Sequence, residues 1–284
     1  MCLGIALMMG LATAVYADRC PVERSFSHTD VMTMGMIDST DYRYDIMFKG
    51  DTATLNCDDD GGYKVYFENV DTAVVHFGLL FPHAKDFNEY GNFAADFEFS
   101  VSGGAPYFLV GVQGYTSEPH AEFSIVDYWT YDNADTSTFG TKLGEFTVDG
   151  DTYDIWHNTV NVQVLTNSAS YEQYFSIRRN KRKSGHIDIT AHFKKWEELG
   201  LKVGKIDEIL ALVEGSKAKN TSSSVYFKYF DITETAGSTG TTAISRRASL
   251  PLLKSDARVF DMQGRYLGTS EKKISPAIRT VKKR

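Results

Sequence analysis

The chain of 284 residues is long enough for one large β domain with additional segments at its ends. Aromatic residues make up 13% of it, Gly is plentiful and Pro is scarce, which indicates a folded, sheet-rich body rather than a disordered chain. The formal net charge of −7 disfavours nucleic acid as a partner.

Residues 1–17 form an apolar run that ends in small residues, which is typical of a secretory signal peptide cleaved after Ala17. A membrane anchor is the alternative, but such a run is short for a bilayer span. We therefore expect a protein that is secreted or located at the cell surface, without membrane contact once the signal is removed.

Residues 18–40 are expected to form an N-terminal arm. Cys20 in this arm could form a disulfide with Cys57 in an oxidising compartment, and two free thiols are the alternative. The cysteines and the scattered histidines lack metal-ligand spacing, so we expect no metal site.

Residues 41–234 read as short runs of alternating apolar and polar residues, which is typical of antiparallel strands. Asp149-Gly150 is the strongest hairpin signal among them. The many strands without intervening helices favour an all-β fold with two sheets in a sandwich. The candidate strands are YRYDIMF, TATLNC, YKVYFEN, TAVVHFG, FAADFEFSV, PYFLVGVQ, AEFSIVDYW, GEFTV, TYDIWHN, VNVQVL, YEQYFSIRR, HIDITA, EILALVE and SVYFKYFDI.

One helix is predicted within this region, in the sequence AHFKKWEELG. Thr190 is the expected N-cap, and Gly200 is expected to end the helix. Phe193, Trp196 and Leu199 fall on one apolar stripe, so we expect the helix to pack on the back of a sheet.

Residues 235–255 are mostly small and polar, which indicates a linker. Residues 256–284 form a basic C-terminal segment with one hairpin-like stretch around Gly264.

Two glutamates, Glu122 in AEFSIVDYW and Glu214 in LALVEGS, lie in strand-like runs far apart in the chain. An ionised carboxylate on a sheet face is costly unless that face lines a wet groove. Two such strands facing one groove would hold two carboxylates across a substrate, which is the arrangement that cleaves a glycosidic bond.

Four pieces of the chain resemble the glycoside hydrolase family 11 xylanases. EPHAEFSIVDYW is similar to the nucleophile strand of the family, and GEFTVDGDTYDIW to the hairpin that leads to its thumb. QYFSIRRNKRKSG followed by HFKKWEELGL is similar to its strand, basic turn and helix, and ALVEG to its acid/base strand. The order and spacing of the four pieces also agree with the family.

The resemblance implies a bent two-sheet β-jelly-roll sandwich with one helix and a thumb hairpin. It implies that Glu122 is the nucleophile and Glu214 the acid/base of a retaining hydrolase. Carboxyl groups about 5–5.5 Å apart cannot easily both ionise, so Glu214 should retain its proton. The mechanism needs no cofactor.

Five further residues are candidates for substrate binding. Gln173 matches a family glutamine near the nucleophile, and its amide could hold Glu122 or a sugar hydroxyl. Tyr171 and Phe175 flank it on the same strand face, where a ring can stack on a pyranose or simply pack in the sheet. Gln113 and Tyr115 occupy the positions of a family tyrosine and tryptophan.

The chain also departs from the family pattern at several positions that contact substrate or the carboxylates. A tyrosine is replaced by Ser124, and arginines are replaced by Ser117 and Val160. The positions of two family tryptophans fall near Met47 or Phe48 and near Leu79, so neither tryptophan is present. The sequence of the thumb is VQVLTNSAS. These changes predict a groove with fewer hydrogen-bond donors and fewer stacking platforms.

Other polar residues are expected at the surface, in the groove or in solvated turns. The expected surface or groove residues are His76, His83, His120 and His157. Asp127 is expected at the surface or the strand end, and the acidic run 58–60 in a solvated turn, with calcium binding as the alternative. A solvated turn is also expected for the cluster Arg178, Arg179, Lys181, Arg182 and Lys183, with attraction of acidic xylan as the alternative.

The function expected from these features is that of a secreted endo-1,4-β-xylanase, a monomer whose partner is the polysaccharide xylan. The alternatives are a jelly-roll that binds polysaccharide without turnover and a hydrolase of another β-glycan. VFDMQGRYLG near the C-terminus weakly resembles type IX-like sorting domains, and a basic tail that binds acidic surfaces is the alternative.

Overall fold

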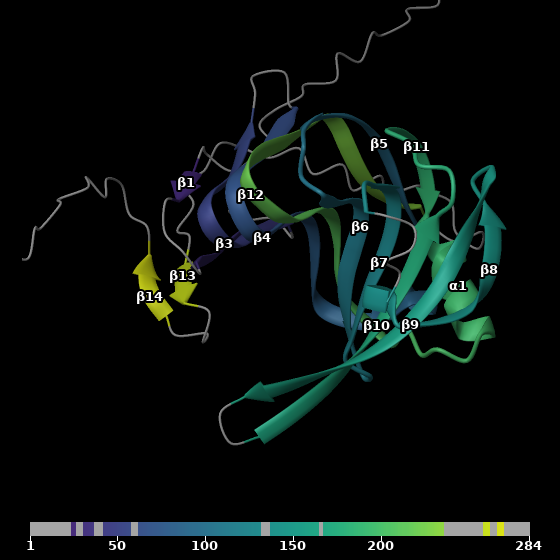
Figure 1. The fold of residues 1–284 in the computed structure, drawn as a ribbon. Helices are drawn as coiled ribbons and strands as arrows, with labels where there is room; N and C mark the ends of the chain where they lie inside the picture. Colours follow the sequence, from purple (N-terminus) through teal and green to yellow (C-terminus); the bar gives the residue numbers. More distant parts are fainter. Residues whose placement is uncertain are drawn as a thin grey trace, which may run out of the picture.

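The computed structural model describes residues 24–26, 31–36, 42–57, 62–131, 137–164, 167–235, 258–261 and 266–269, and its body is built almost entirely of strands (Figure 1). The elements are β1 (Arg24–Phe26), β2 (Val31–Met36), β3 (Tyr42–Cys57), β4 (Tyr63–Asp86), η1 (Phe87–Glu89), β5 (Asn92–Gly103), β6 (Tyr107–Ser117), β7 (Ala121–Trp129), η2 (Ser137–Phe139), β8 (Thr141–Val148), β9 (Asp151–Val164), β10 (Asn167–Arg178), β11 (Ser184–Asp188), α1 (Ile189–Glu198), β12 (Lys205–Thr235), β13 (Arg258–Asp261) and β14 (Tyr266–Thr269). None of the helices in these ranges has the length and apolarity needed to span a membrane.

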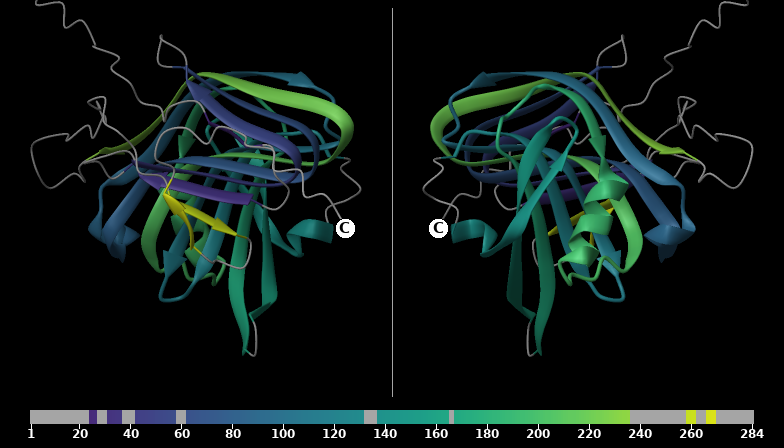
Figure 2. Two further views of the ribbon diagram at one scale, coloured as in Figure 1. Left: turned by 90° about the vertical axis from the view of Figure 1, so that its left-hand side faces the viewer. Right: turned by 90° about the vertical axis from the view of Figure 1, so that its right-hand side faces the viewer.

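The strands form one hydrogen-bonded array that folds over into two layers. Its main path runs β14-β13-β2-β3-β4-β12-β6-β7-β10-β9-β8, and β5 joins through β12. Residues 205–216 of β12 pair with β6, and residues 223–235 of the same strand pair with β5. Figure 2 shows β12 curving from one layer into the other, so the expected bent two-sheet sandwich is confirmed.

Three of the strands are longer than the sequence pattern predicted. YRYDIMF and TATLNC merge into β3, YKVYFEN and TAVVHFG merge into β4, and EILALVE and SVYFKYFDI merge into β12. Irregularities turn the chain at the junctions while the neighbouring strands stay paired. Gly50 has a φ of +143°, and a Cβ there would lie 2.5 Å from the carbonyl oxygen of Asn69. Asn69 itself has a φ of 49° and accepts a hydrogen bond from the backbone N–H of Asn220 at 3.0 Å.

The predicted hairpins are present. β8 and β9 pair through Val148 and Asp151, and both turn residues, Asp149 and Gly150, have positive φ, as a tight hairpin turn requires. β9 and β10 then project beyond the other strands as a long two-stranded hairpin (Figure 1). This projection matches the expected thumb in backbone shape.

Helix α1 packs where it was expected, but its cap is different. Asp188, at the end of β11, accepts a hydrogen bond from the backbone N–H of Ala191 at 2.9 Å and is therefore the N-cap. The prediction of Thr190 was wrong, because its hydroxyl accepts instead from the backbone N–H of Phe93 at 2.7 Å and fastens the helix to β5. Trp196 is fully buried, and its ring lies 5.8 Å from that of Phe123 on β7.

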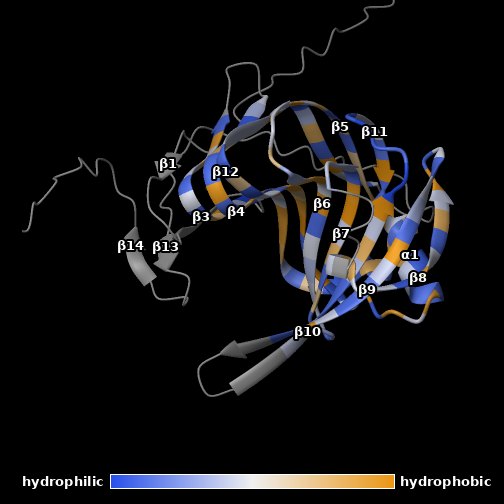
Figure 3. Ribbon diagram, in the orientation of Figure 1, coloured by the Kyte–Doolittle hydropathy of each residue, from blue (hydrophilic) through white to orange (hydrophobic). Residues whose placement is uncertain are grey.

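Alternation along the central strands separates two faces, and Figure 3 shows apolar and polar residues alternating along β6 and β7. On β7, Phe123 and Ile125 point into the main core together with the helix. Glu122, Ser124 and Val126 point to the other face. The helix is therefore on the side of the sheet that Glu122 does not occupy.

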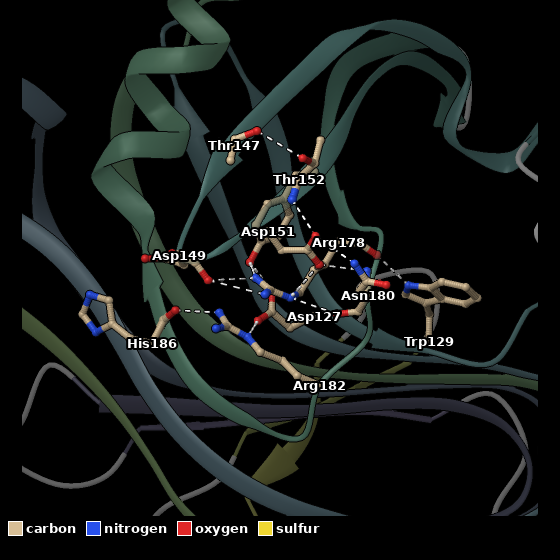
Figure 4. A network of polar contacts seen from close by, with 11 residues as sticks. Asp127, Trp129, Thr147, Asp149, Asp151, Thr152, Arg178, Asn180, Arg182 and His186 are labelled. Carbon is tan, nitrogen blue, oxygen red and sulfur yellow. Dashed lines mark hydrogen bonds and ion pairs between the residues drawn. The ribbon is translucent and has the colours of Figure 1, made fainter.

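Asp127, which we expected at the surface or the strand end, is fully buried at the centre of a polar network (Figure 4). It accepts hydrogen bonds from the hydroxyl of Tyr153 at 2.7 Å and from Nε of Arg182 at 2.5 Å. Arg178, also buried, donates to the same tyrosine oxygen at 3.1 Å. The surface prediction failed because Arg178 at the end of β10 and Arg182 in the turn that follows point inward, and their charges oppose the effect of burial on this carboxylate.

The basic cluster at the end of β10 and in the turn that follows therefore has two roles. Arg178 and Arg182 belong to the buried network, so the prediction of a wholly solvated cluster was wrong for them. Arg179, Lys181 and Lys183 are exposed as predicted. Lys181 also lies 5.0 Å from the ring of Trp129, close enough for a cation–π contact.

Several sequence predictions concern positions outside the described residues. These are the signal peptide 1–17, the linker beyond Thr235, the acidic run 58–60 and the side chains of the thumb tip. The pairing of Cys20 with Cys57 also falls there. Backbone pairing of β13 with β2 is described, but the sorting-like role of residues 256–284 is not tested by it.

We predict that Asp127→Asn lowers the free energy of unfolding by about 1–3 kcal/mol, because the guanidinium of Arg182 loses its charged acceptor in a largely buried setting. Denaturant unfolding followed by circular dichroism measures this. The matched control is Lys142→Met, which removes an ion pair to Asp154 at 2.9 Å between partly exposed side chains. That variant should change stability by less than about 1 kcal/mol, and equal losses in the two variants would contradict the buried-network interpretation.

Candidate active site

The face of the sheet that carries Glu122 and Glu214, here called the carboxylate face, collects polar side chains from neighbouring strands. Glu122 on β7 lies opposite Tyr115 on β6 and Gln173 on β10. Glu214 lies on β12, which pairs with the other side of β6. The two glutamates are thus separated by one strand and placed on the same face by alternation. Both side chains are partly buried.

Two glutamine amides hold the carboxylate of Glu122, one at each oxygen. Gln113 Nε2 donates to Oε1 at 2.6 Å, and Gln173 Nε2 donates to Oε2 at 3.3 Å. The Gln173 amide is oriented by Asn158, whose Nδ2 donates to its Oε1 at 3.1 Å. Gln113 Nε2 also reaches the hydroxyl of Ser124 at 3.2 Å. Each amide therefore presents its donor end to the carboxylate, which favours the ionised form of Glu122.

The environment of Glu214 has the opposite effect. Burial and the negative charge of Glu122 raise its pKa to about 7. No donor among the described residues hydrogen-bonds its carboxyl group, so little opposes this rise except the charge of His76. Burial also raises the pKa of Glu122, but hydrogen bonds from Gln173 and Gln113 and the charge of His76 oppose it. Hydrogen bonds therefore favour the ionised form of Glu122, while Glu214 carries a proton at a pH below about 7.

The structure separates the five candidate substrate residues into three groups. Gln113 is buried and Gln173 partly buried, and both hold Glu122 rather than standing free. Tyr115 and Tyr171 are partly buried, and burial together with the charge of Glu122 raises the pKa of each phenol. Phe175 is only 8% exposed, and its ring packs 5.0 Å from that of Phe139 in a second apolar cluster. The structure supports the packing interpretation of Phe175 and not the stacking one.

Sequence reasoning missed a charged cluster that adjoins the pair. Arg43 on β3 bridges Asp45 on the same strand and Glu208 on β12, donating to Glu208 Oε1 at 2.6 Å. Asp45 in turn pairs with His76 on β4, with Oδ1 2.9 Å from Nδ1. Burial raises the pKa of Glu208 to about 7, and the charge of Arg43 opposes this rise. The spacing of Arg43 and Asp45 within YRYDIMF, two residues apart, was the available signal, because it places two opposite charges on one strand face.

The expectation for the four histidines holds for three of them. His83 and His120 are exposed, and His157 is partly buried and pairs with Glu172. The prediction that His76 is a surface or groove residue was wrong, because only 1% of this residue is exposed. Its ion pair with Asp45, formed directly across β3 and β4, is what allows a polar ring to be buried there.

Within the described ranges, no group of three or more His, Cys, Asp or Glu side chains is arranged to hold a metal ion. The chemical capacity of the carboxylate face therefore consists of a carboxylate held by amide donors and a nearby carboxyl group that can carry a proton at neutral pH. These are the two components of acid-assisted nucleophilic displacement.

Comparison with known proteins agrees with this chemistry. The model of the family "Glycosyl hydrolases family 11" matches residues 39–226. Endo-1,4-beta-xylanase C of Fibrobacter succinogenes is 35% identical over 252 residues, which is 83% of this chain and 41% of that protein. Endo-1,4-beta-xylanase A of Bacillus pumilus is 33% identical over 224 residues, which is 78% of this chain and 90% of that protein.

Solved structures give the same result. The wild-type ENZbleach xylanase superimposes with a TM-score of 0.65 at 27% identity, over 76% of this chain and 88% of that one. The chain spans less than half of the Fibrobacter protein and 28% of a second similar protein, endo-1,4-beta-xylanase A of Piromyces. The similarity therefore covers a unit that can stand alone, as in Bacillus pumilus, or form part of a longer protein.

We predict that Glu122→Gln lowers the pKa of Glu214, because the negative charge that raises it is removed while the side chain keeps nearly the same shape. Carbon-13 NMR of labelled glutamate carboxyls, followed as a function of pH in the protein without substrate, measures this directly. Glu172→Gln is the matched control, since Glu172 lies next to Gln173 on β10 but points to the other face. An unchanged pKa of Glu214 in Glu122→Gln would show that the two groups do not interact.

Proposed function

The chain belongs to the glycosyl hydrolases of family 11, and from this premise we propose that it is an endo-1,4-β-xylanase that hydrolyses internal bonds of xylan with retention of configuration. The observation that carries the proposal is the unequal pair on the carboxylate face: Glu122 held as an acceptor by two amides, and Glu214 with its pKa raised to about 7.

The proposed reaction has two displacements. In the first, a carboxylate oxygen of Glu122 attacks the anomeric carbon, the glycosidic bond breaks, and the leaving oxygen takes the proton of Glu214. In the second, Glu214 removes a proton from water, the water oxygen attacks the same carbon, and the bond to Glu122 breaks. Both groups return to their starting protonation states, so no further reactant is required.

The surrounding residues have distinct proposed roles. Gln113 and Gln173 fix the attacking carboxylate, one at each oxygen, so that little orientational freedom remains to be lost in the transition state. Tyr115 and Tyr171 are the described rings near Glu122 that remain candidates for contact with the sugar. The substrate itself is inferred from the relatives, whose names identify them as endo-1,4-beta-xylanases.

A protein that only binds polysaccharide is less well supported. That alternative was based on the loss of aromatic residues and hydrogen-bond donors from the carboxylate face. Gln113, at the position of a family tyrosine, donates to Glu122 at 2.6 Å, so at this position a donor is replaced rather than lost. A hydrolase restricted to another β-glycan remains an outcome that the substrate panel below distinguishes.

Export, the monomeric state and the role of the C-terminal segment are part of the proposal. The apolar run at residues 1–17 supports secretion or display at the cell surface, where a polymeric glycan is accessible. The resemblance of VFDMQGRYLG to type IX-like sorting domains supports a sorting role for residues 256–284, and a basic tail that binds acidic surfaces is the alternative.

We predict that the protein releases reducing ends from xylan and not from mixed-linkage glucan or carboxymethyl cellulose. Glu122→Gln and Glu214→Gln should each reduce turnover by at least about 10³-fold, because each removes a group that the displacement requires. Circular dichroism and thermal unfolding establish that both variants fold.

The control for this experiment is Glu172→Gln, which should keep nearly normal turnover. Binding of xylan without new reducing ends in the unmodified protein would favour the binding-only alternative. Near-normal rates in either Glu122→Gln or Glu214→Gln would show that the roles are misassigned.

We also predict a bell-shaped dependence of kcat/KM on pH. As the pH rises through about 7, Glu214 loses the proton that it must donate, so activity falls on the alkaline side. As the pH falls, protonation of Glu122 removes the nucleophile, so activity also falls on the acidic side. Initial rates on a soluble aryl xyloside or short xylan fragments across pH 4–9 measure both limbs, and an alkaline limb absent up to pH 9 would contradict the assignment of Glu214.

A further inference from the structure

A buried ion pair lies close to the catalytic candidates but makes no contact with the surface. His76 on β4 and Asp45 on β3 face each other directly across the two strands, with Nδ1 and Oδ1 2.9 Å apart. Each side chain is 1% exposed. A buried ion pair is weak support for stability, because its desolvation cost can exceed the attraction between the charges. The pair lies beside Glu122 and Glu214, and this position indicates a role in addition to holding the two strands together.

Two buried polar atoms near this pair have no hydrogen-bond partner among the described residues. They are Nε2 of His76 and Oε1 of Gln113. The two side chains are nevertheless close enough for Gln113 to help raise the pKa of His76. The other end of the same amide, Nε2, donates to Glu122 Oε1 at 2.6 Å. One side chain, Gln113, thus lies between the buried imidazole and the carboxylate.

The protonation state of His76 determines which end of this amide faces which neighbour. A protonated imidazole has two N–H donors and no acceptor. With one N–H directed to Asp45, the other needs a second acceptor, and the carbonyl end of Gln113, which has no hydrogen-bond partner of its own within the described ranges, can supply one. That choice leaves the NH₂ end for Glu122, where a carbonyl oxygen would instead repel the carboxylate.

His76 is also surrounded by acidic groups that favour its charged form. The nearest is Asp45, whose charge raises the pKa of His76 against the effect of burial. The charge of His76 in turn opposes the rise in pKa that burial causes in three glutamates on the carboxylate face. The titratable and charged groups that face it are Arg43 and Asp45 from β3, Glu208 and Glu214 from β12, Tyr115 from β6 and Glu122 from β7.

We propose that His76, held as an imidazolium by Asp45, is a positioning residue for the nucleophile: it locks the amide of Gln113 with its NH₂ group on Glu122 and supplies the positive charge that keeps this carboxylate ionised. The inference rests on the proposed function, since it assigns these residues to the same displacement. His76 touches neither substrate nor the reacting atoms, and it acts through Gln113 and through its charge.

The first test is the protonation state of His76 in the unmodified protein. Nitrogen-15 NMR of labelled imidazole distinguishes two protonated ring nitrogens from one. We expect His76 to carry both protons at pH 6 and to lose one only above the ordinary histidine pKa of about 6.5. A neutral imidazole at pH 6 would overturn the proposal, and this measurement requires neither a variant nor any activity.

The second test is His76→Gln, which removes the charge while Asp45 keeps its pairing with Arg43. We expect the pKa of Glu122, followed by carboxyl NMR without substrate, to rise. We expect kcat on xylan to fall about 10–100-fold, as for loss of a charge-assisted contact, with KM little changed and with the acidic limb of the pH profile moved upward. Asp45→Asn serves as a second variant if His76→Gln does not fold, with the same loss of kcat expected.

Asp127→Asn is the matched control. Its carboxylate is as deeply buried and also ion-paired, but it lies on the opposite face of the sheet. It should lose stability while the titration of Glu122 stays that of the unmodified protein. If His76→Gln behaves in the same way, losing stability without moving the pKa of Glu122 or kcat, the pair is only structural and the proposal fails. If the unmodified protein cleaves no glycan, the proposed function fails, whereas the two NMR titrations still decide the positioning role.

Discussion

Two carboxyl groups that are partly buried on one face of a β-sheet repel each other, and this repulsion is the interaction on which the rest of the site depends. The protein does not relieve it equally for the two groups. Glu122 receives an amide donor at each oxygen, whereas Glu214 receives none from the described residues. Hydrogen bonds therefore oppose the effect of burial on the pKa of Glu122 but not on that of Glu214. An asymmetry of hydrogen bonding thereby becomes a division between a nucleophile and an acid.

This asymmetry is possible because the two faces of the same strands differ: one face packs in the core, and the other carries the polar groups. The face toward α1 is filled by Phe123, Phe193 and Trp196, which hold the strands in a fixed register. On that side Asp127 closes the basic turn through Arg182. With packing provided there, the opposite face can carry charged groups whose burial would otherwise destabilise the fold.

The departures from the family pattern acquire a different meaning in three dimensions. Read along the chain, Gln113 in place of a family tyrosine was a candidate for substrate binding. In the structure, Gln113 donates to Glu122, and its side chain also helps to raise the pKa of His76, which pairs with Asp45. A set of polar side chains thus surrounds the nucleophile where the family pattern has aromatic ones, and its charge balance is set by residues from four strands.

Features that depend on a local pattern of residues could be predicted from the amino-acid sequence. Alternation placed Glu122 and Glu214 on sheet faces, Asp149-Gly150 specified a hairpin, and the stripe of Phe193 and Trp196 specified a helix, because each of these follows from the geometry of a few consecutive residues. Which side chains meet depends on how the strands pair. Asp45, His76 and Gln113 are distant in the chain, and they come together because β3, β4, β12 and β6 pair side by side. The burial of Asp127 and the packing of Phe175 on Phe139 could not be predicted for the same reason. Burial depends on which other segments cover a residue, and the residue pattern of one strand does not indicate this.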